Sequence, residues 1–206
     1  MDALSDLFDR CPSLSACEGE ILRALDLLLA CYRNGGKVLT CGNGGSAADA
    51  EHIVGELLKK FKRHRDVDPV VAERLPADLV AKLEGALPAI SLVSMSGILT
   101  AFANDVSWET AFAQQVLGLG RPGDVLIALS TSGNSANCVN AALVARAKGM
   151  KVISLTGRAG SRLSALSDAA VRVPETETYR VQELHLPVYH ALCAAVEEAL
   201  FSPAAS

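Results

Sequence analysis

The sequence has few aromatic residues and no long block of like charge. Only 4% of its 206 residues are aromatic, whereas half are hydrophobic, which favours the Ala, Leu and Val core of an α/β protein. A domain of this length buries enough apolar surface to fold without disulfides. The net charge is −4, and together with the lack of a basic block this argues against direct binding of nucleic acid.

Targeting signals, long apolar runs and paired cysteine motifs are also missing. The N-terminus has no basic segment followed by an apolar run, and no apolar run reaches about 18 residues. We therefore expect a cytoplasmic protein with no membrane partner. The six cysteines are scattered without a CxxC pair, which indicates free thiols in a reducing compartment: Cys11, Cys17, Cys31, Cys41, Cys138 and Cys193.

The first 33 residues have a helical pattern that Asn34-Gly35-Gly36 ends. Leu22 and Leu29 add a second apolar side to it. A helix that is apolar on two sides either packs against another subunit or lies within an ordinary core, and both interpretations remain open. The first apolar side consists of Ile21, Ala24, Leu25, Leu28 and Cys31.

The segment 37–61 predicts a strand, a glycine loop and a helix. An apolar run at 37–41 precedes Gly42-Asn43-Gly44-Gly45, and Ser46 opens an Ala-rich helix. Glycines let a ligand approach the backbone, and the free N–H groups of a helix start attract anions. The loop is neither a GxGxxG nor a Walker A sequence. His52 and Glu56 lie about 6 Å apart on one face of this helix; alone, such a pair is most often a solvated face.

Four further apolar runs alternate with helical segments and predict a parallel sheet covered by helices on both faces. Ligands of such folds bind at the carboxyl ends of the strands. The expected strands are 89–94, 125–129, 151–155 and 169–173, and the expected helices are 96–102, 107–117, 136–148 and 179–201, with Asn104-Asp105 at a break.

A hydroxyl-rich loop follows the strand 125–129. It contains Ser130, Thr131, Ser132 and Ser135 and leads into a helix. An ordinary helix cap needs only one serine, whereas several hydroxyls and N–H groups at a helix start suit a phosphate dianion. We therefore interpret this loop as a phosphate site at the same edge of the sheet as the 42–46 loop.

The segment 63–87 predicts a surface excursion. It begins in a basic cluster at 62–65, and the helical pattern of 70–83 breaks at Pro76 and restarts at Ala77. The segment is either a lid beside the site or an insertion that packs on the domain, and packing is the simpler interpretation.

Two helices carry nitrogen and oxygen donors that suit zinc and proton transfer. His52 and Glu56 lie on one, and Gln182 and His190 on the other. Aldose–ketose isomerisation of a sugar phosphate requires such a pair beside a phosphate anchor. Gln182 and His190 are about 12 Å apart along a straight helix, whereas Gln182 and His185 would be the easier local pair. Either Gln182 and His190 reach one ion from opposite sides, or different subunits contribute them.

Three segments resemble the sugar isomerase (SIS) domain family and, more narrowly, its phosphoheptose (sedoheptulose 7-phosphate) isomerases. They are CGNGGSAADAEH at 41–52, ALSTSGNSANCVNAALVARAKGMKVISLTG at 128–157 and RVQELHLPVYHALCAAVEE at 180–198. The resemblance covers nearly the whole chain. It implies one SIS domain over 1–206 with oligomerisation helices at 1–34, in a flavodoxin-like three-layer sandwich with a five-stranded parallel sheet. It also implies a homotetramer with sites between subunits.

The resemblance further implies conversion of sedoheptulose 7-phosphate to D-glycero-D-manno-heptose 7-phosphate through an enediol, an early step toward ADP-heptose and lipopolysaccharide core. Glu56 would be the base and His190 the acid, and one Zn²⁺ per subunit would be held by His52, Glu56, Gln182 and His190. His185 is no ligand in that family, which implies packing. Substrate contacts would come from Asn43, Gly44, Gly45, Ser46, Glu56, Asn104, Asp105, Ser130, Thr131, Ser132, Ser135 and Gln182.

One departure and two alternatives accompany this interpretation. The family connects across 63–87 with far fewer residues, which leaves the contacts of Arg63 and Arg65 open. The chain also resembles a non-catalytic SIS adaptor that binds the replication initiator DnaA, and SIS modules that sense sugar phosphates. The adaptor lacks the full acid–base and metal set, whereas Glu56 and His190 are both present here, which favours the enzyme.

Overall fold

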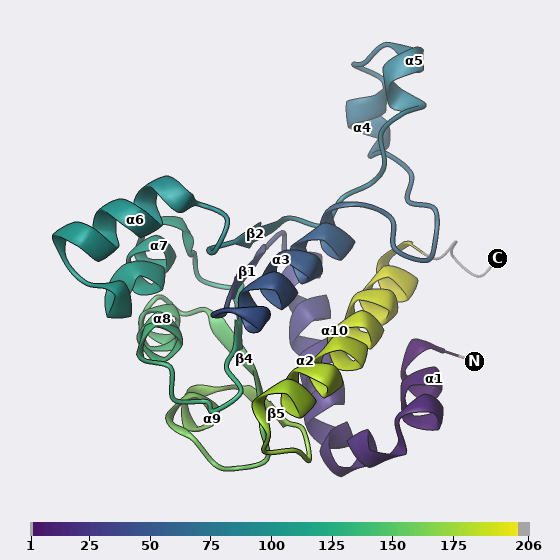
Figure 1. Ribbon diagram of the computed structural model, residues 1–206. Coiled ribbons are helices and arrows are strands. Elements are labelled where there is room, and N and C mark those ends of the chain that lie inside the picture. Colours follow the sequence, from purple (N-terminus) through teal and green to yellow (C-terminus); the bar gives the residue numbers. More distant parts are fainter. Residues whose placement is uncertain (1, 202–206) are drawn as a thin grey trace.

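The computed structural model describes residues 2–201 and contains one five-stranded parallel sheet between two layers of helices (Figure 1). The strand order is β2-β1-β3-β4-β5, and every neighbouring pair is parallel, which confirms the expected fold class. The strands are β1 (Val38–Cys41), β2 (Ala89–Ser91), β3 (Val125–Leu129), β4 (Lys151–Thr156) and β5 (Ala169–Arg172).

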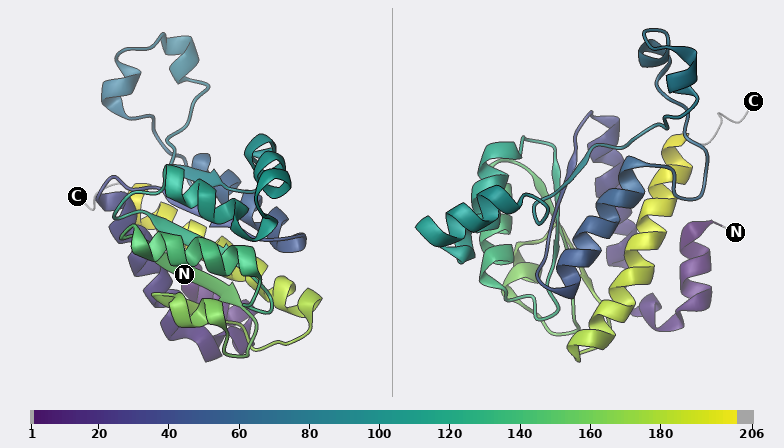
Figure 2. Two further views of the ribbon diagram at one scale, coloured as in Figure 1. Left: turned by 90° about the vertical axis from the view of Figure 1, so that its left-hand side faces the viewer. Right: turned by 45° about the horizontal axis from the view of Figure 1, so that its top comes forward.

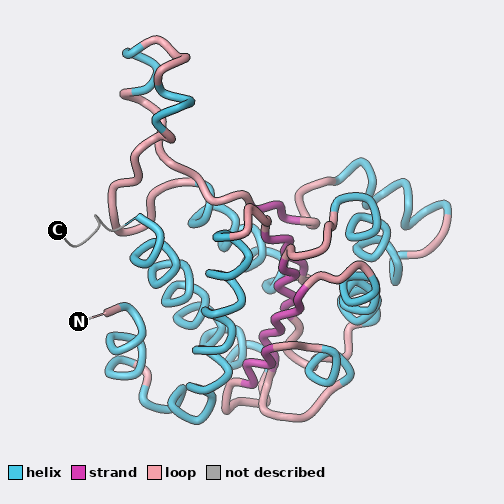
Figure 3. The backbone as a smooth tube through the Cα atoms, turned by 180° about the vertical axis from the view of Figure 1, so that it is seen from behind, coloured by secondary structure: helices cyan, strands magenta, loops and turns pink. Residues whose placement is uncertain are grey.

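The strand side chains alternate between two hydrophobic cores. Val125, Ile127 and Leu129 of β3 belong to one core, and Leu126 and Ala128 to the other, because successive side chains of a strand point to opposite faces. Both faces are therefore covered, as the continuous apolar sequence of β3 indicates. Figure 3 shows the strands as a single band with helices on each side.

The two helical layers come from different parts of the chain (Figure 2). The first contains α1 (Ala3–Arg10), η1 (Pro12–Cys17), α2 (Glu18–Arg33), α3 (Gly45–Leu58) and α10 (Thr178–Phe201). The second contains α6 (Ser96–Asp105), η2 (Trp108–Thr110), α7 (Ala111–Leu119), α8 (Ala136–Ala147) and α9 (Arg162–Leu166).

The connections place the two candidate loops side by side. β1 lies between β2 and β3, and its last residue, Cys41, pairs with Ala128 of β3. The chain leaves β1 toward one face of the sheet through α3, and leaves β3 toward the other face through α8. This reversal is the switch point at which open α/β sheets bind ligands.

Helices α3 and α10 run in the same direction along each other (Figure 2). Gly45 at the start of α3 faces Gln182, and His52 faces Tyr189 about two turns further along both helices. Phe61 just beyond α3 contacts Glu197. The first layer therefore aligns two segments that are about 137 residues apart in the sequence, as the His52–Tyr189 contact shows. This alignment brings the candidate acid and base together.

Several expected boundaries are wrong. The N-terminal helical segment is interrupted at Cys11-Pro12, because proline ends one helix and begins a 3₁₀ turn; Met1 lies outside the described residues. Asn104 and Asp105 form the end of α6 and not a break after it. The expected helix 107–117 is a 3₁₀ turn followed by α7, and the short helix α9 was not expected.

The segment 63–87 projects from the body of the domain as an arm (Figures 1 and 2). Its two short helices are α4 (Pro69–Ala72) and α5 (Ala77–Val80), so the predicted restart at Ala77 is confirmed. All residues of both helices are exposed or half-exposed, including Val70 and Val71. The expectation that this segment packs on the domain is therefore wrong for its two helices, whereas Arg65 and Leu87 near its ends are buried.

Helix α2 buries one apolar side and exposes part of the other. The predicted core side of α2 is buried at Ile21, Ala24, Leu28 and Cys31, whereas Leu22 on its second side is 44% exposed.

All six cysteines are free thiols. None of the helices within residues 2–201 combines the length and apolar character needed to cross a lipid bilayer.

Candidate active site

The loops after β1 and β3 line one pocket of about 250 Å³ at the switch point. Ser46 is buried in the first turn of α3, and Ser130 is buried directly after β3. The start of α3 therefore faces a concave surface rich in hydroxyl groups, which suits an anion. The lining residues are Asn43, Gly44, Gly45, Ser46, Leu129, Ser130, Thr131, Ser135, Thr178 and Gln182.

Two glycines of the first loop have no room for a side chain. A methyl group on Gly42 would lie 2.3 Å from the Ser46 carbonyl oxygen, and one on Gly45 would lie 2.6 Å from Nε2 of Gln182. Gly44 has a φ of 57°, a conformation that favours glycine. The glycine run therefore folds the loop tightly and lets Gln182 approach the backbone.

The second loop is shaped by its own hydrogen bonds. The hydroxyls of Ser130 and Ser135 lie 3.0 Å apart, so they face the pocket as a pair. Ser132 lies on the exposed side of the loop, where its hydroxyl accepts the N–H of Asn134. Of the four predicted hydroxyls, Ser130, Thr131 and Ser135 therefore line the pocket, and Ser132 does not.

Asn137 holds the two loops together. Its side-chain amide exchanges two hydrogen bonds with Asn43, of 2.9 and 2.8 Å. Because this pairing occupies the amide of Asn43, the side chain braces the pocket wall. The sequence interpretation missed Asn137, and a lone asparagine in the first turn of a helix gives no signal of a partner 94 residues away.

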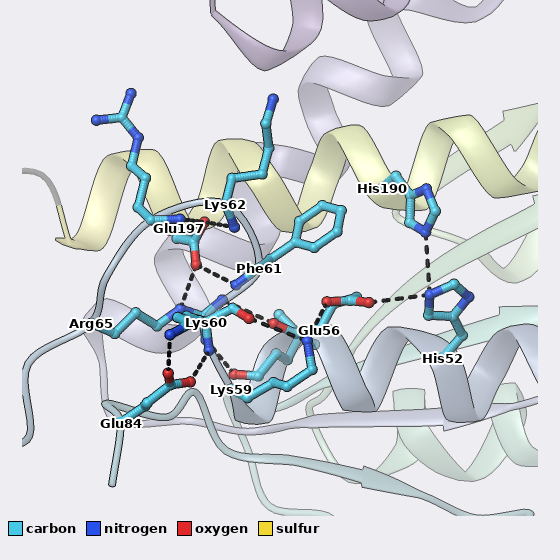
Figure 4. A network of polar contacts seen from close by, with 12 residues as sticks. His52, Glu56, Lys59, Lys60, Phe61, Lys62, Arg65, Glu84, His190 and Glu197 are labelled. Atoms are coloured by element: carbon cyan, nitrogen blue, oxygen red, sulfur yellow. Dashed lines mark hydrogen bonds and ion pairs between the residues drawn. The ribbon is translucent and has the colours of Figure 1, made fainter. Parts of the chain in front are cut away.

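Further along α3, His52 lies between Glu56 and His190 (Figure 4). Its Nε2 is 3.1 Å from Oε1 of Glu56 and 3.3 Å from Nε2 of His190. Lys59 contacts the other oxygen of Glu56 at 3.1 Å. The side chain of Glu56 is only 11% exposed, whereas that of His52 is 42% exposed. A carboxylate and two imidazoles from two helices thus meet at the surface.

The second nitrogen of His52 contacts Tyr189 of α10. Nδ1 of His52 lies 3.0 Å from the Tyr189 hydroxyl, which in turn donates to Asp49 at 3.1 Å. Burial and the neighbouring Asp49 carboxylate raise the pKa of Tyr189, so this residue stays protonated. Burial also raises the pKa of Asp49, against the hydrogen bond from Tyr189.

His190 is less basic than a free histidine. Burial and the neighbouring His52 lower its pKa, because both disfavour the imidazolium. At neutral pH the His190 side chain is therefore a neutral imidazole. Such a ring offers one N–H donor and one lone pair.

The four predicted zinc ligands are not all together in one chain. His52 contacts Glu56 and His190, whereas Gln182 lies against Gly45 at the hydroxyl-rich pocket. Gln182 and His190 are eight residues apart on α10, or about 12 Å. Within residues 2–201, no three His, Cys, Asp or Glu side chains are arranged as a ligand set. Two imidazoles and a carboxylate nevertheless match the donor chemistry of zinc.

Asn104, Asp105 and His185 line neither the hydroxyl-rich pocket nor the cluster of His52, Glu56 and His190. Asn104 and Asp105 are exposed at the end of α6, where the Asn104 amide donates to Asp105. His185 is fully buried, which agrees with packing. Burial lowers its pKa to about 4, against a smaller effect of the Thr156 backbone. Neither of its ring nitrogens makes a well-formed hydrogen bond to another described residue.

A buried ion pair anchors the end of α3 and the root of the arm (Figure 4). Arg65 and Glu197 are both 0% exposed, and Nε of Arg65 donates to Glu197 at 2.7 Å. The guanidinium also donates to the carbonyls of Leu57 and Glu56. Glu197 accepts three backbone N–H groups, from Phe61, Lys62 and Arg63. The open question of the Arg65 contacts is thus answered: it caps the helix that carries Glu56.

The chain is similar to known proteins over most of its length. The SIS domain family matches residues 12–86 and 72–157. The chain is 43% identical over 189 residues to the phosphoheptose isomerase of Rhodospirillum rubrum, covering 92% of this chain and 90% of that protein. It belongs to the phosphoheptose isomerase family of SIS domains. The chain is therefore an isomerase.

Solved structures of this family share the fold over nearly the whole chain. Phosphoheptose isomerase GmhA of Neisseria gonorrhoeae is 34% identical with a TM-score of 0.76, and each chain is covered to 95%. A phosphoheptose isomerase of Francisella tularensis is 31% identical with a TM-score of 0.77, covering 96% of this chain and all of the other. The resemblance seen in the sequence is thus confirmed.

Proposed function

We propose that the chain interconverts sedoheptulose 7-phosphate and D-glycero-D-manno-heptose 7-phosphate. The observation that carries this proposal is the contact of His52 with both Glu56 and His190, on the same helix pair that lines the hydroxyl-rich pocket. An aldose–ketose isomerase needs a base, an acid and a phosphate anchor, and these groups supply all three. Among sugar phosphates, membership of the phosphoheptose isomerase family favours a phosphoheptose as the substrate.

Glu56 is proposed as the base and His190 as the acid. The Glu56 carboxylate removes a proton from the carbon beside the carbonyl, which gives an enediol, and returns it to the neighbouring carbon. His190 donates its proton to the carbonyl oxygen in the first half of the reaction and recovers one from the other hydroxyl in the second. Its lowered pKa makes it a neutral donor at neutral pH.

The phosphate is proposed to bind at the switch-point pocket. Ser46, Ser130, Thr131 and Ser135 offer hydroxyl groups there, and the first turn of α3 offers N–H groups. Ser132 is exposed and does not line this pocket. Asn43, Gly44 and Gly45 would line the sugar, whereas Asn104 and Asp105 lie outside this pocket at the end of α6.

The donor set supports one Zn²⁺ per subunit. His52, Glu56 and His190 would hold it, and Gln182 would complete the set from a neighbouring copy, because it lies at the phosphate pocket within its own chain. When bound, zinc would polarise the sugar carbonyl. This arrangement agrees with a homotetramer whose sites lie between subunits, in a cytoplasmic enzyme that serves ADP-heptose and lipopolysaccharide core synthesis.

An isomerase assay with sedoheptulose 7-phosphate, with and without a chelator, tests the substrate and the metal together. We expect turnover that the chelator abolishes and added zinc restores. Turnover that persists with all metal removed would contradict the zinc proposal alone. If protein supplied with zinc gives no turnover and retains DnaA in a pull-down, the result favours the adaptor interpretation over the proposed isomerase reaction.

A further inference from the structure

Tyr189 occupies a position between two residues of the neighbouring helix. It projects from α10 and is 2% exposed. Its hydroxyl donates to Oδ1 of Asp49 at 3.1 Å and lies 3.0 Å from Nδ1 of His52. The Tyr189 ring also meets the His52 ring edge-on, with centroids 5.4 Å apart. The two α3 residues are three apart, so they share one helix face.

The hydrogen-bonding capacity of these groups decides where the proton of His52 lies. A carboxylate only accepts, so the single proton of the Tyr189 hydroxyl goes to Asp49. The tyrosine oxygen then offers a lone pair to His52. Nδ1 of His52 completes this contact only as a donor, which means that it carries the ring proton.

We propose that Asp49 and Tyr189 act as positioning residues that keep the proton of neutral His52 on Nδ1. The lone pair of Nε2 is then turned toward Glu56 and His190, the groups that lie 3.1 and 3.3 Å from this atom. This inference deepens the proposed function and rests on it for its catalytic purpose. The proton position itself is independent of the reaction and is measured without substrate.

Glu56 competes with this arrangement. Its Oε1 would accept a proton on Nε2 of His52, and would thus favour the opposite tautomer. The competition is removed in a Glu56→Ala background, because alanine has no acceptor. In the Asp49–Tyr189 relay, Asp49 accepts the Tyr189 hydroxyl proton and the Tyr189 oxygen accepts from Nδ1 of His52. Without Glu56, only solvent competes with this relay for the proton of His52.

The experiment records long-range ¹⁵N–¹H correlations of the imidazoles in metal-free protein at about pH 8.5, where ordinary histidines are neutral. The sequence has four histidines, and the signals of His52 are those lost in His52→Gln. In the Glu56→Ala protein we expect His52 in the Nδ1–H tautomer. Adding Tyr189→Phe should populate both tautomers, because the oxygen acceptor is gone.

Asp49 variants give a sharper test. In Asp49→Ala the tyrosine proton is released from its acceptor and can be donated to Nδ1, so the Nε2–H tautomer should dominate. Asp49→Asn keeps a side-chain oxygen acceptor and should retain Nδ1–H. Tyr179→Phe is the matched control, since Tyr179 lies on the same helix and its hydroxyl accepts from Arg180. A His52 ring in the Nε2–H form in the Glu56→Ala protein, or a tautomer ratio that adding Tyr189→Phe leaves unchanged, overturns the relay.

Zinc affinity provides a second readout in protein that retains Glu56. Loss of the hydrogen-bonded partner of a metal-binding histidine typically weakens affinity about 10–100-fold. We expect such a loss in Tyr189→Phe, measured by competition with a chromogenic chelator, and no loss in Tyr179→Phe. Equal affinity in Tyr189→Phe would contradict the relay. If the parent binds no zinc, the metal of the proposed function fails, whereas the tautomer spectra still decide the relay.

Discussion

Nε2 of His52 and Nε2 of His190 lie 3.3 Å apart, although 138 residues separate them in the sequence. The contact exists because α3 and α10 run side by side in the same direction (Figure 2). Helix α3 also begins at the hydroxyl-rich pocket, and α10 contributes Gln182 to it. One pair of helices therefore carries the proposed acid–base groups and also contributes Ser46 and Gln182 to the pocket proposed to bind the phosphate.

Replacing His190 with glutamine should remove acid catalysis and leave the fold intact. General acid catalysis typically contributes about 10²–10⁴-fold to the rate, so we expect kcat to fall by that factor with little change in KM. The assay is turnover of sedoheptulose 7-phosphate under zinc saturation. His64→Gln, at an exposed histidine of the arm root, is the control and should keep wild-type kcat.

The lack of room for a side chain at Gly45 predicts that a larger residue there weakens substrate binding. In Gly45→Ala the new methyl group would lie 2.6 Å from Nε2 of Gln182 and would displace that side chain from the pocket. Loss of one hydrogen bond to a charged ligand corresponds to about tenfold in affinity or more, so KM should rise by about that factor. Gly55→Ala on the same helix meets nothing within 4 Å. An unchanged KM in Gly45→Ala would show that Gln182 does not bind the substrate.

The buried pair of Arg65 and Glu197 should be the most sensitive ionic contact of the fold. Breaking a fully buried ion pair typically costs about 3–5 kcal/mol, so Arg65→Met should lower the free energy of unfolding by that amount in urea at pH 7. The exposed pair of Asp6 and Arg10 is the comparison, and Asp6→Asn should cost less than about 1 kcal/mol. Equal effects of the two variants would contradict the role given to the buried pair.

The burial of His185 predicts that the folded protein loses stability in mild acid. Burial lowers its pKa to about 4 in the folded chain, whereas the unfolded value is about 6.5. Above pH 6.5 both states are neutral, and stability is lost as the pH falls from about 6.5 to 4, because only the unfolded chain gains the proton. The difference corresponds to about 3 kcal/mol.

The His185→Leu variant tests this assignment. Leucine fills a similar volume and leaves no unpaired ring nitrogen, so the variant should be at least as stable at pH 7 and should lose the decline between pH 6.5 and 4. Unfolding curves at several pH values measure this. His64→Gln should retain the wild-type decline, and a His185→Leu protein with the same decline would assign it to another group.

The sequence predicted the layers of the fold because each strand is a short apolar run. Val125–Leu129 is apolar throughout, and both glycine- and serine-rich loops follow strands, so their position at one sheet edge follows from parallel topology. Asn104 and Asp105 were expected at a break, but they end α6. Local preference does not define a helix end within a few residues.

The contacts that complete the site could not be predicted. Tyr189 and Arg65 are ordinary residues in their own segments, and their roles come from partners that lie on other elements. Only the packing of α10 against α3 brings these pairs together. The sequence left open whether Gln182 and His190 reach one ion from opposite sides or from different subunits, and within one chain Gln182 lies against Gly45.

The most direct test of the central claim is the kcat of Glu56→Gln for sedoheptulose 7-phosphate with zinc supplied. Glutamine keeps the size of the side chain and cannot accept the carbon-bound proton, so turnover should fall by about 10²–10⁴-fold while the protein stays folded. Glu51→Gln, an exposed position on the same helix, should retain wild-type turnover. A Glu56→Gln protein with wild-type kcat would contradict the assignment of Glu56 as the base.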